Sequence, residues 1–170
     1  AQQILEGLIA AHQAGMIHRD LKPQNIMRTR LPSGGWQYKI LDFGLARFVT
    51  QPTVQSMEGN TSIYGSIFFI APEQLKHLPL DARTDIFAVG VVFLELLTAR
   101  RAFDAESDLG VLEKVRQANL PPDAFAGLPP ELAALIMPAL AKGAADRYQN
   151  AAEMLVEVRR CARSLDAHMT

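Results

Sequence analysis

One short segment, residues 18–25, constrains this chain more than any other stretch. It reads His18-Arg19-Asp20-Leu21-Lys22-Pro23-Gln24-Asn25 and so places a carboxylate, an ammonium and an amide close together. Pro23 restricts the backbone between them because its ring fixes φ. A loop that points Asp20, Lys22 and Asn25 into one space could handle a hydroxyl proton, a phosphate and a metal ion together. The rest of the chain must then supply a scaffold, a second metal ligand and a place for a substrate.

Composition limits the classes of protein that can carry such a loop. The chain has 170 residues, enough for one domain with its own core, and a net charge of −1. That charge argues against a nucleic-acid partner bound through a broad basic face. The single cysteine, Cys161, excludes an internal disulfide and fits a reducing compartment, so we expect a cytoplasmic protein. No signal peptide is visible, and the most apolar run, 86–97, is too short to be a membrane segment.

Hydrophobic periodicity predicts a mainly α-helical domain. The run 86–97 carries one charge, Glu95, so we expect it to form a helix that is buried at the centre of the domain. Thr84 or Asp85 is the predicted N-cap of this helix. Further helices are predicted over residues 2–14, 72–77, 107–118, 131–142 and 151–163.

Residues 26–41 predict a β-hairpin. Two short apolar strands flank the turn signal Pro32-Ser33-Gly34-Gly35. Such a hairpin would hold Asn25 at its entrance and Asp42 at its exit, close together in space. Residues 45–70 show neither helical nor strand periodicity, and a loop of that length inside a domain is usually functional or disordered.

Three motifs in order carry a family resemblance. The segment 18–25, then Asp42-Phe43-Gly44, then Ala71-Pro72-Glu73 resemble the large lobe of a eukaryotic-type protein kinase, most of all a bacterial Ser/Thr kinase. The resemblance implies a mainly α fold with a small β-hairpin beside the catalytic loop, and one partial kinase domain over residues 1–170. It also implies an activation segment at 42–73 and transfer of the γ-phosphate of ATP to Ser/Thr hydroxyls of a protein substrate.

The resemblance assigns a role to each polar residue of the expected site. Asp20 would accept or orient the proton of the attacking hydroxyl, and Lys22 would neutralise charge on the transferring phosphoryl group. Asn25 and Asp42 would hold Mg²⁺, which prefers hard oxygen ligands. Met27 would form part of the floor under the adenine ring of ATP. Chemistry of this kind depends on positioning and charge neutralisation.

The resemblance also suggests substrate class and regulation. In the family, a Lys at the position of Lys22 goes with Ser/Thr kinases. Arg19, beside the catalytic Asp, resembles the arginine of kinases that are switched on by phosphorylation of the activation loop. A phosphate on Thr53 or Thr61 could pair with Arg19, although ordinary solvation is the alternative explanation of these hydroxyls. Ser66 lies where the family usually has a Thr that bonds to the catalytic loop, and a serine keeps that hydroxyl.

Other matching residues have structural roles in the family. Glu73 and Arg147 match a buried ion pair that ties the activation segment to the late helices. His18 and Phe43 would stack in the core. Asp85 matches an Asp that caps the central helix and bonds back to the backbone of the catalytic loop.

The sequence lacks the motifs of a kinase small lobe. It has no Gly-x-Gly-x-x-Gly before a strand, no Val-Ala-x-Lys strand, and no helix with the Glu that pairs with that Lys. The chain begins at Ala1 and reads as helix at once, so we interpret it as the start of a large lobe within a longer protein. We predict that these 170 residues alone bind ATP poorly and transfer phosphate negligibly.

Two other functions fit a kinase-like fold. One is a non-catalytic binding module that docks partners through its peptide groove and late helices. The intact Asp20, Asn25 and Asp42 count against it. The other is a small-molecule phosphotransferase of related fold, which Ala71-Pro72-Glu73 and the long activation segment disfavour.

Overall fold

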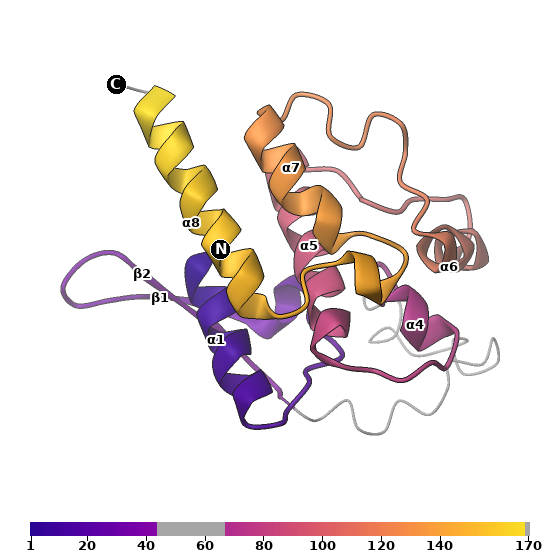
Figure 1. Ribbon diagram of the computed structural model, residues 1–170, viewed down its shortest axis with the longest axis horizontal. Helices are drawn as coiled ribbons and strands as arrows, with labels where there is room; N and C mark the ends of the chain where they lie inside the picture. Colours follow the sequence, from indigo (N-terminus) through magenta and orange to yellow (C-terminus); the bar gives the residue numbers. More distant parts are fainter. Residues whose placement is uncertain (44–66, 169–170) are drawn as a thin grey trace.

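The fold is mainly helical, with one small antiparallel sheet at its side (Figure 1). The computed structural model describes residues 1–43 and 67–168. The helices are α1 (Gln2–Gln13), α4 (Pro72–Leu75), α5 (Ala82–Thr98), α6 (Asp108–Gln117), α7 (Pro130–Ala139) and α8 (Ala151–His168). The strands are β1 (Ile26–Arg30) and β2 (Trp36–Ile40), and short 3₁₀ turns span Pro23–Asn25 and Ala144–Asp146. The predicted fold class, mainly α with a β-hairpin, is confirmed.

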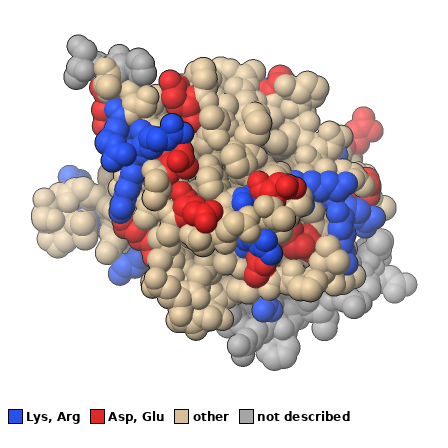
Figure 2. Space-filling view, viewed as in Figure 1, with Lys and Arg blue, Asp and Glu red and all other residues tan. Residues whose placement is uncertain are grey.

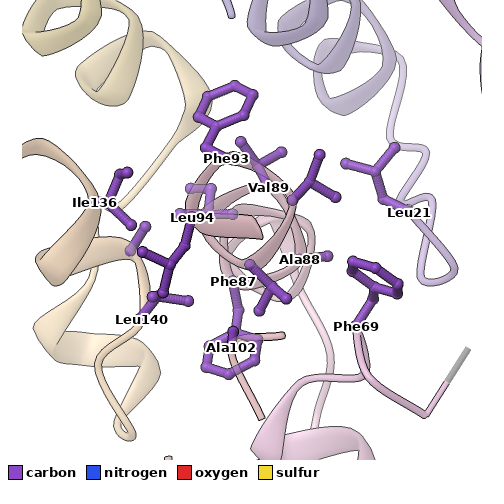
Figure 3. Close-up of a cluster of buried hydrophobic side chains, with 14 of the residues drawn as sticks. Leu21, Phe69, Phe87, Ala88, Val89, Phe93, Leu94, Ala102, Ile136 and Leu140 are labelled. Carbon is purple, nitrogen blue, oxygen red and sulfur yellow. The ribbon is translucent and has the colours of Figure 1, made fainter. Parts of the chain in front are cut away.

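Helix α5 forms the centre of the core. Every residue from Thr84 to Leu94 is buried, as the nearly uncharged sequence predicts for most of the run. The prediction was wrong at the end of the run, where Leu96 and Leu97 are 70% and 44% exposed. Figure 3 shows side chains of α5 meeting Ile136 and Leu140 on one side and Leu21 and Phe69 on the other. Leu21 belongs to the 18–25 loop and is 1% exposed, so the loop is anchored in the core by an apolar side chain. Burying one leucine contributes about 1.5–3 kcal/mol.

The predicted cap of α5 was wrong. The helix begins at Ala82, and its N-cap is Asp81, whose Oδ1 accepts the backbone N–H of Arg83 at 2.9 Å. Thr84 and Asp85 lie inside the first turns and are buried. The prediction placed the start of the helix where the apolar run begins. The first turn of α5 instead contains polar residues, and Thr84 and Asp85 make hydrogen bonds to other parts of the fold.

Helices α5 and α7 approach each other closely at Gly90. A Cβ on this residue would lie 2.9 Å from the Cβ of Ala139 and 3.0 Å from the Cδ2 of Leu140. Real side chains do not pack that tightly, so any larger residue would push the helices apart. The absence of a side chain here therefore sets the spacing between the central helix and α7.

The predicted hairpin over residues 26–41 is confirmed. Strands β1 and β2 pair antiparallel with Ile26 opposite Ile40. Gly34 and Gly35 both have φ of 85°, which glycine adopts without strain, at the turn. The side chain of Gln3 on α1 binds the outer edge of β2, accepting from Tyr38 N–H at 2.7 Å and donating to a backbone carbonyl of the same strand. Helix α1 thus fixes the hairpin whose two ends flank the site.

Helix α8 packs along α1 and carries arginines of two surface ion pairs. Arg159 pairs with Glu6 at 2.9 Å and Arg160 with Glu157 at 2.6 Å. On the face shown in Figure 2, basic and acidic side chains lie next to each other, with no broad surface of one sign. Among the described residues, no helix combines the length and the apolar character that crossing a membrane requires.

Candidate active site

Asp85 holds the backbone of the 18–25 loop from below. Its carboxylate accepts the N–H of His18 at 2.9 Å through Oδ2 and the N–H of Arg19 at 2.8 Å through Oδ1. The Asp85 side chain is fully buried, and a buried carboxylate needs such donors to offset the loss of water. Arg19 adopts a left-handed conformation with φ of 67°, which the two bonds help to maintain.

His12 is a third partner of Asp85 that sequence reasoning missed. Its Nε2 lies 2.8 Å from Asp85 Oδ2, while its Nδ1 is buried without a hydrogen-bond partner in the described part of the chain. The two residues are 73 positions apart, and no local pattern connects them. The end of α1, the loop and α5 therefore meet at one carboxylate.

His18 connects the loop to the residues that follow the hairpin. The backbone N–H of Asp20 donates to its Nδ1 at 3.3 Å, so Nε2 carries the ring proton and donates to the carbonyl of Leu41 at 2.8 Å. The imidazole also meets the ring of Phe43 edge to face, with centroids 4.9 Å apart. His18 is 1% exposed, which makes it a packing and bridging residue.

Asp20, Lys22 and Asn25 lie together in the loop. The Nζ of Lys22 is 2.8 Å from Asp20 Oδ2, and the Nδ2 of Asn25 donates to the Asp20 carbonyl at 2.7 Å. The Asp20 side chain is 31% exposed, whereas that of Lys22 is only 12% exposed. An accessible carboxylate beside a nearly buried ammonium can receive a proton while a negative group is held next to it.

Asp42 lies beside Asn25 across the base of the hairpin. The N–H of Leu41 donates to the Asn25 carbonyl at 2.8 Å, and Asp42 is the next residue. Asp42 is exposed and has φ of 60°, a strained conformation of the kind that is enriched at functional sites. Met27, one of the exposed apolar residues, lies opposite Lys39 in the adjoining strand pair.

The side-chain oxygens of Asn25 and Asp42 are suitable ligands for a hard cation. The Nδ2 of Asn25 is occupied by Asp20, and within residues 1–43 and 67–168 no hydrogen bond uses its Oδ1. That oxygen and the Asp42 carboxylate are ligands of the type that Mg²⁺ prefers. The described residues contain no group of three or more His, Cys, Asp or Glu that could hold a metal. Asn25 and Asp42 could therefore supply two oxygen ligands to such an ion.

A second polar cluster, around Glu73 and Arg147, joins α4 to the late part of the chain. The guanidinium of Arg147 binds both carboxylate oxygens of Glu73, at 2.7 and 2.8 Å, and Thr84 donates to the same carboxylate at 3.0 Å. Burial raises the pKa of Glu73, but the hydrogen bonds and charge of Arg147 outweigh it and hold the pKa below its usual value. The other N–H groups of Arg147 donate to backbone carbonyls, at residues 83, 141 and 142. The cluster fixes where α4 begins.

Gln74 is another residue that sequence reasoning missed. Its Nε2 donates to the Arg19 carbonyl at 2.9 Å, and its Oε1 accepts the N–H of Ala71 at 2.9 Å. The second bond is one half of a local capping box, but Ala71 at the N-cap lacks the Ser or Thr hydroxyl that marks this pattern in a sequence. The first joins residues that are 55 positions apart and leaves no sequence signal.

Some of the predicted regulatory residues cannot be placed. Thr53, Thr61 and Ser66 lie outside the described residues. Arg19, their expected partner, is an exposed residue whose backbone is bound on both sides.

Comparison with known proteins gives matches that cover most of this chain. The family model described as the protein kinase domain matches residues 1–157. Similar sequences include the probable serine/threonine-protein kinase PknB of Corynebacterium glutamicum, 41% identical over 97% of this chain and 26% of that protein. Another is the serine/threonine-protein kinase PknL of Mycobacterium tuberculosis, 36% identical over 95% of this chain and 39% of that protein. The chain thus spans between about a quarter and two fifths of the length of these relatives.

A solved structure of a kinase is also similar to this chain. The twitchin kinase region from C. elegans superimposes with a TM-score of 0.72 and 28% sequence identity, over 92% of this chain and 26% of that one.

Proposed function

This chain belongs to the eukaryotic-type Ser/Thr protein kinases, and from that premise we propose that its parent protein transfers the γ-phosphate of ATP to Ser and Thr hydroxyls of proteins. The observation that carries the proposal is the joint placement of Asp20, Lys22 and Asn25, with the Lys22 ammonium 2.8 Å from the Asp20 carboxylate. Base, cation and metal ligand then share one space.

Asp20 is the proposed acceptor of the hydroxyl proton. Its carboxylate is accessible, and its backbone is held by Asn25 at the carbonyl and by His18 at the N–H. Lys22 is the proposed neutraliser of charge on the phosphoryl group during transfer. Both contributions are electrostatic and positional, as phosphoryl transfer requires.

Asn25 and Asp42 are the proposed ligands of Mg²⁺. The Oδ1 of Asn25, which no hydrogen bond among the described residues uses, and the exposed Asp42 carboxylate support this assignment. When bound, Mg²⁺ would bridge phosphate oxygens of ATP and neutralise their charge. Met27, exposed on β1, is the proposed apolar surface under the adenine ring.

Regulation through the activation segment, residues 42–73, is part of the same proposal. Arg19 has an exposed side chain on an anchored backbone, which suits pairing with a phosphate on Thr53 or Thr61. Ser66 is the proposed hydroxyl partner of the catalytic loop. A cytoplasmic location also belongs to the proposal, since the single cysteine, Cys161, is free and buried.

The experiment that tests the proposed function identifies the acceptor hydroxyl. The parent protein is incubated with γ-labelled ATP, Mg²⁺ and a mixed protein substrate, and the labelled amino acids are separated after hydrolysis. Label on Ser and Thr is expected, and omission of Mg²⁺ should remove it. Label on Tyr or on a small molecule would contradict the proposed substrate class.

A parallel assay tests whether residues 1–170 are a partial domain. We propose that the isolated chain transfers negligible phosphate, because its sequence holds no Gly-rich loop and no strand Lys for ATP. Transfer by the isolated chain at the rate of the parent protein would contradict this. Peptide binding without transfer by the parent protein would instead favour a non-catalytic binding module.

A further inference from the structure

Gln74 makes two hydrogen bonds that serve different parts of the molecule. Its Oε1 accepts the N–H of Ala71 at 2.9 Å and so caps the N-terminus of α4. Its Nε2 donates to the carbonyl of Arg19 at 2.9 Å, which reaches the 18–25 loop. One planar amide therefore links the beginning of α4 to the loop that carries the base.

The carbonyl of Arg19 and the N–H of Asp20 belong to one peptide group. Because a peptide group is planar, a bond at the carbonyl end restricts the orientation of the whole unit. Among the residues that the structure describes, the N–H end is bound by the Nδ1 of His18 alone, at a longer distance of 3.3 Å. The bond from Gln74 is the shorter of the two and therefore restrains the Arg19–Asp20 peptide group more strongly. The orientation of this peptide group determines the direction in which the Asp20 side chain points.

The backbone of Arg19 needs such a hold. Its φ of 67° lies in the left-handed region, and a residue with a side chain stays there only when its surroundings fix it. Asp85 fixes the N–H of Arg19 from inside the core, at 2.8 Å. Gln74 fixes the carbonyl from α4, so Arg19 is bound at both ends.

We propose that Gln74 is a positioning residue that sets the orientation of Asp20 through the Arg19–Asp20 peptide group. It contacts neither substrate nor ATP in this scheme. Its position is tied to α4, which is itself fixed by Glu73 and Arg147 through both carboxylate oxygens of Glu73. The position of the first residues of α4 therefore affects the orientation of Asp20, the proposed base. The inference rests on the proposed kinase function.

Replacing Gln74 by Glu separates its two bonds. A carboxylate oxygen still accepts the N–H of Ala71, and Glu is a favoured residue at this position of a capping box. An ionised carboxylate has no proton to donate, so the bond to the Arg19 carbonyl is lost and two oxygens face each other. Gln74→Ala removes both bonds and should also weaken α4.

Gln2→Glu is the matched control. Gln2 is exposed in the first turn of α1, and none of the hydrogen bonds among the described residues uses its side chain. The substitution adds the same charge at a comparable place in a helix, remote in sequence from the loop. It should leave kcat, KM and the unfolding midpoint at the values of the unaltered protein.

The test compares steady-state kinetics and thermal unfolding of the parent protein and these variants. For Gln74→Glu we expect kcat to fall about five- to tenfold, with KM for ATP and for the protein substrate within about twofold and an unchanged unfolding midpoint. A kcat equal to that of the unaltered protein would overturn the proposal. A loss of kcat matched by an equal loss of folded protein would overturn it too, because Gln74 would then act on folding alone.

A second measurement does not depend on enzyme activity. With ¹⁵N-labelled aspartate, the backbone amide signal of Asp20 should shift in Gln74→Glu and stay in place in Gln2→Glu. An unmoved Asp20 signal in both variants would contradict the bridge. If the unaltered protein transferred no phosphate, the proposed function would fail while this signal still reported on Gln74.

Discussion

Replacing Arg147 by Met removes the centre of the buried cluster around Glu73 while keeping most of the volume of the side chain. Arg147 is 4% exposed and Glu73 is 6% exposed, so water cannot take the place of the lost guanidinium. The substitution leaves a buried carboxylate whose remaining side-chain partner, within residues 1–43 and 67–168, is Thr84 at 3.0 Å. It also removes the donors from backbone carbonyls at residues 83, 141 and 142.

The expected cost is large because one charge stays behind unpaired. Removing one partner of a buried ion pair typically costs about 3–5 kcal/mol. Domains of this kind are stable by about 5–15 kcal/mol, so Arg147→Met should abolish a large share of the stability. Changing both Glu73 and Arg147 to Met removes the unpaired charge, and the double variant should be more stable than the sum of the single costs by about 1–3 kcal/mol.

Urea unfolding followed by circular dichroism measures these differences. The control is Arg159→Met, which breaks an ion pair with Glu6 whose two side chains are about half exposed, at 50% and 49%. An exposed pair contributes about 0–1 kcal/mol, so this control should change little. A cost for Arg147→Met no larger than that of the control would refute the reasoning, as would single costs that simply add in the double variant.

Further predictions concern packing, pH and the anchor of the loop. Gly90→Ala should lower the unfolding free energy by about 1–3 kcal/mol, because the new Cβ would lie 2.9 Å from that of Ala139; an unchanged value in urea unfolding would mean that α5 and α7 can separate at no cost. The pKa of Glu73 is lowered from 4.5, so its contribution to stability is present above that pH and is lost as pH falls through the lower, folded-state value. Acid unfolding of Glu73→Gln should lack this part of the pH dependence, and identical acid curves would contradict the assignment. His12→Leu should cost about 1–3 kcal/mol, because Asp85 loses a donor at 2.8 Å; thermal unfolding at the unaltered midpoint would show that the bond is dispensable.

Local patterns in the sequence predicted the elements of this fold well. The helical spacing of apolar residues located α1 and α8, and the Gly34-Gly35 turn located the hairpin. These signals are local because each reflects the period or the turn chemistry of a single element. Helix bounds were predicted less well, since α7 ends at Ala139 instead of residue 142 and α8 runs to His168 instead of residue 163. The start of α5 was also missed, since several polar residues precede the apolar run and only the folded contacts show that Asp81 is the cap.

In the candidate site too, contacts between residues close in sequence could be predicted and contacts between distant residues could not. The cluster of Asp20, Lys22 and Asn25 could be expected because the three residues are close in sequence and Pro23 limits the loop. Hydrogen-bond partners of the 18–25 loop that come from distant elements could not be expected from the sequence. The bond of Gln74 to the 18–25 loop spans 55 positions and depends on how α4 packs, which no local pattern encodes.

Phosphate transfer by the parent protein and its Asp20→Asn variant tests the central claim most directly. The amide keeps the size of the carboxylate but cannot accept the hydroxyl proton, so kcat should fall by about 10²–10⁴. Binding of Mg²⁺ and ATP, which the proposal assigns to Asn25 and Asp42, should persist. Asp166→Asn, an exposed change on α8, serves as the control and should leave kcat unaltered. Equal transfer by the unaltered protein and Asp20→Asn would contradict the account.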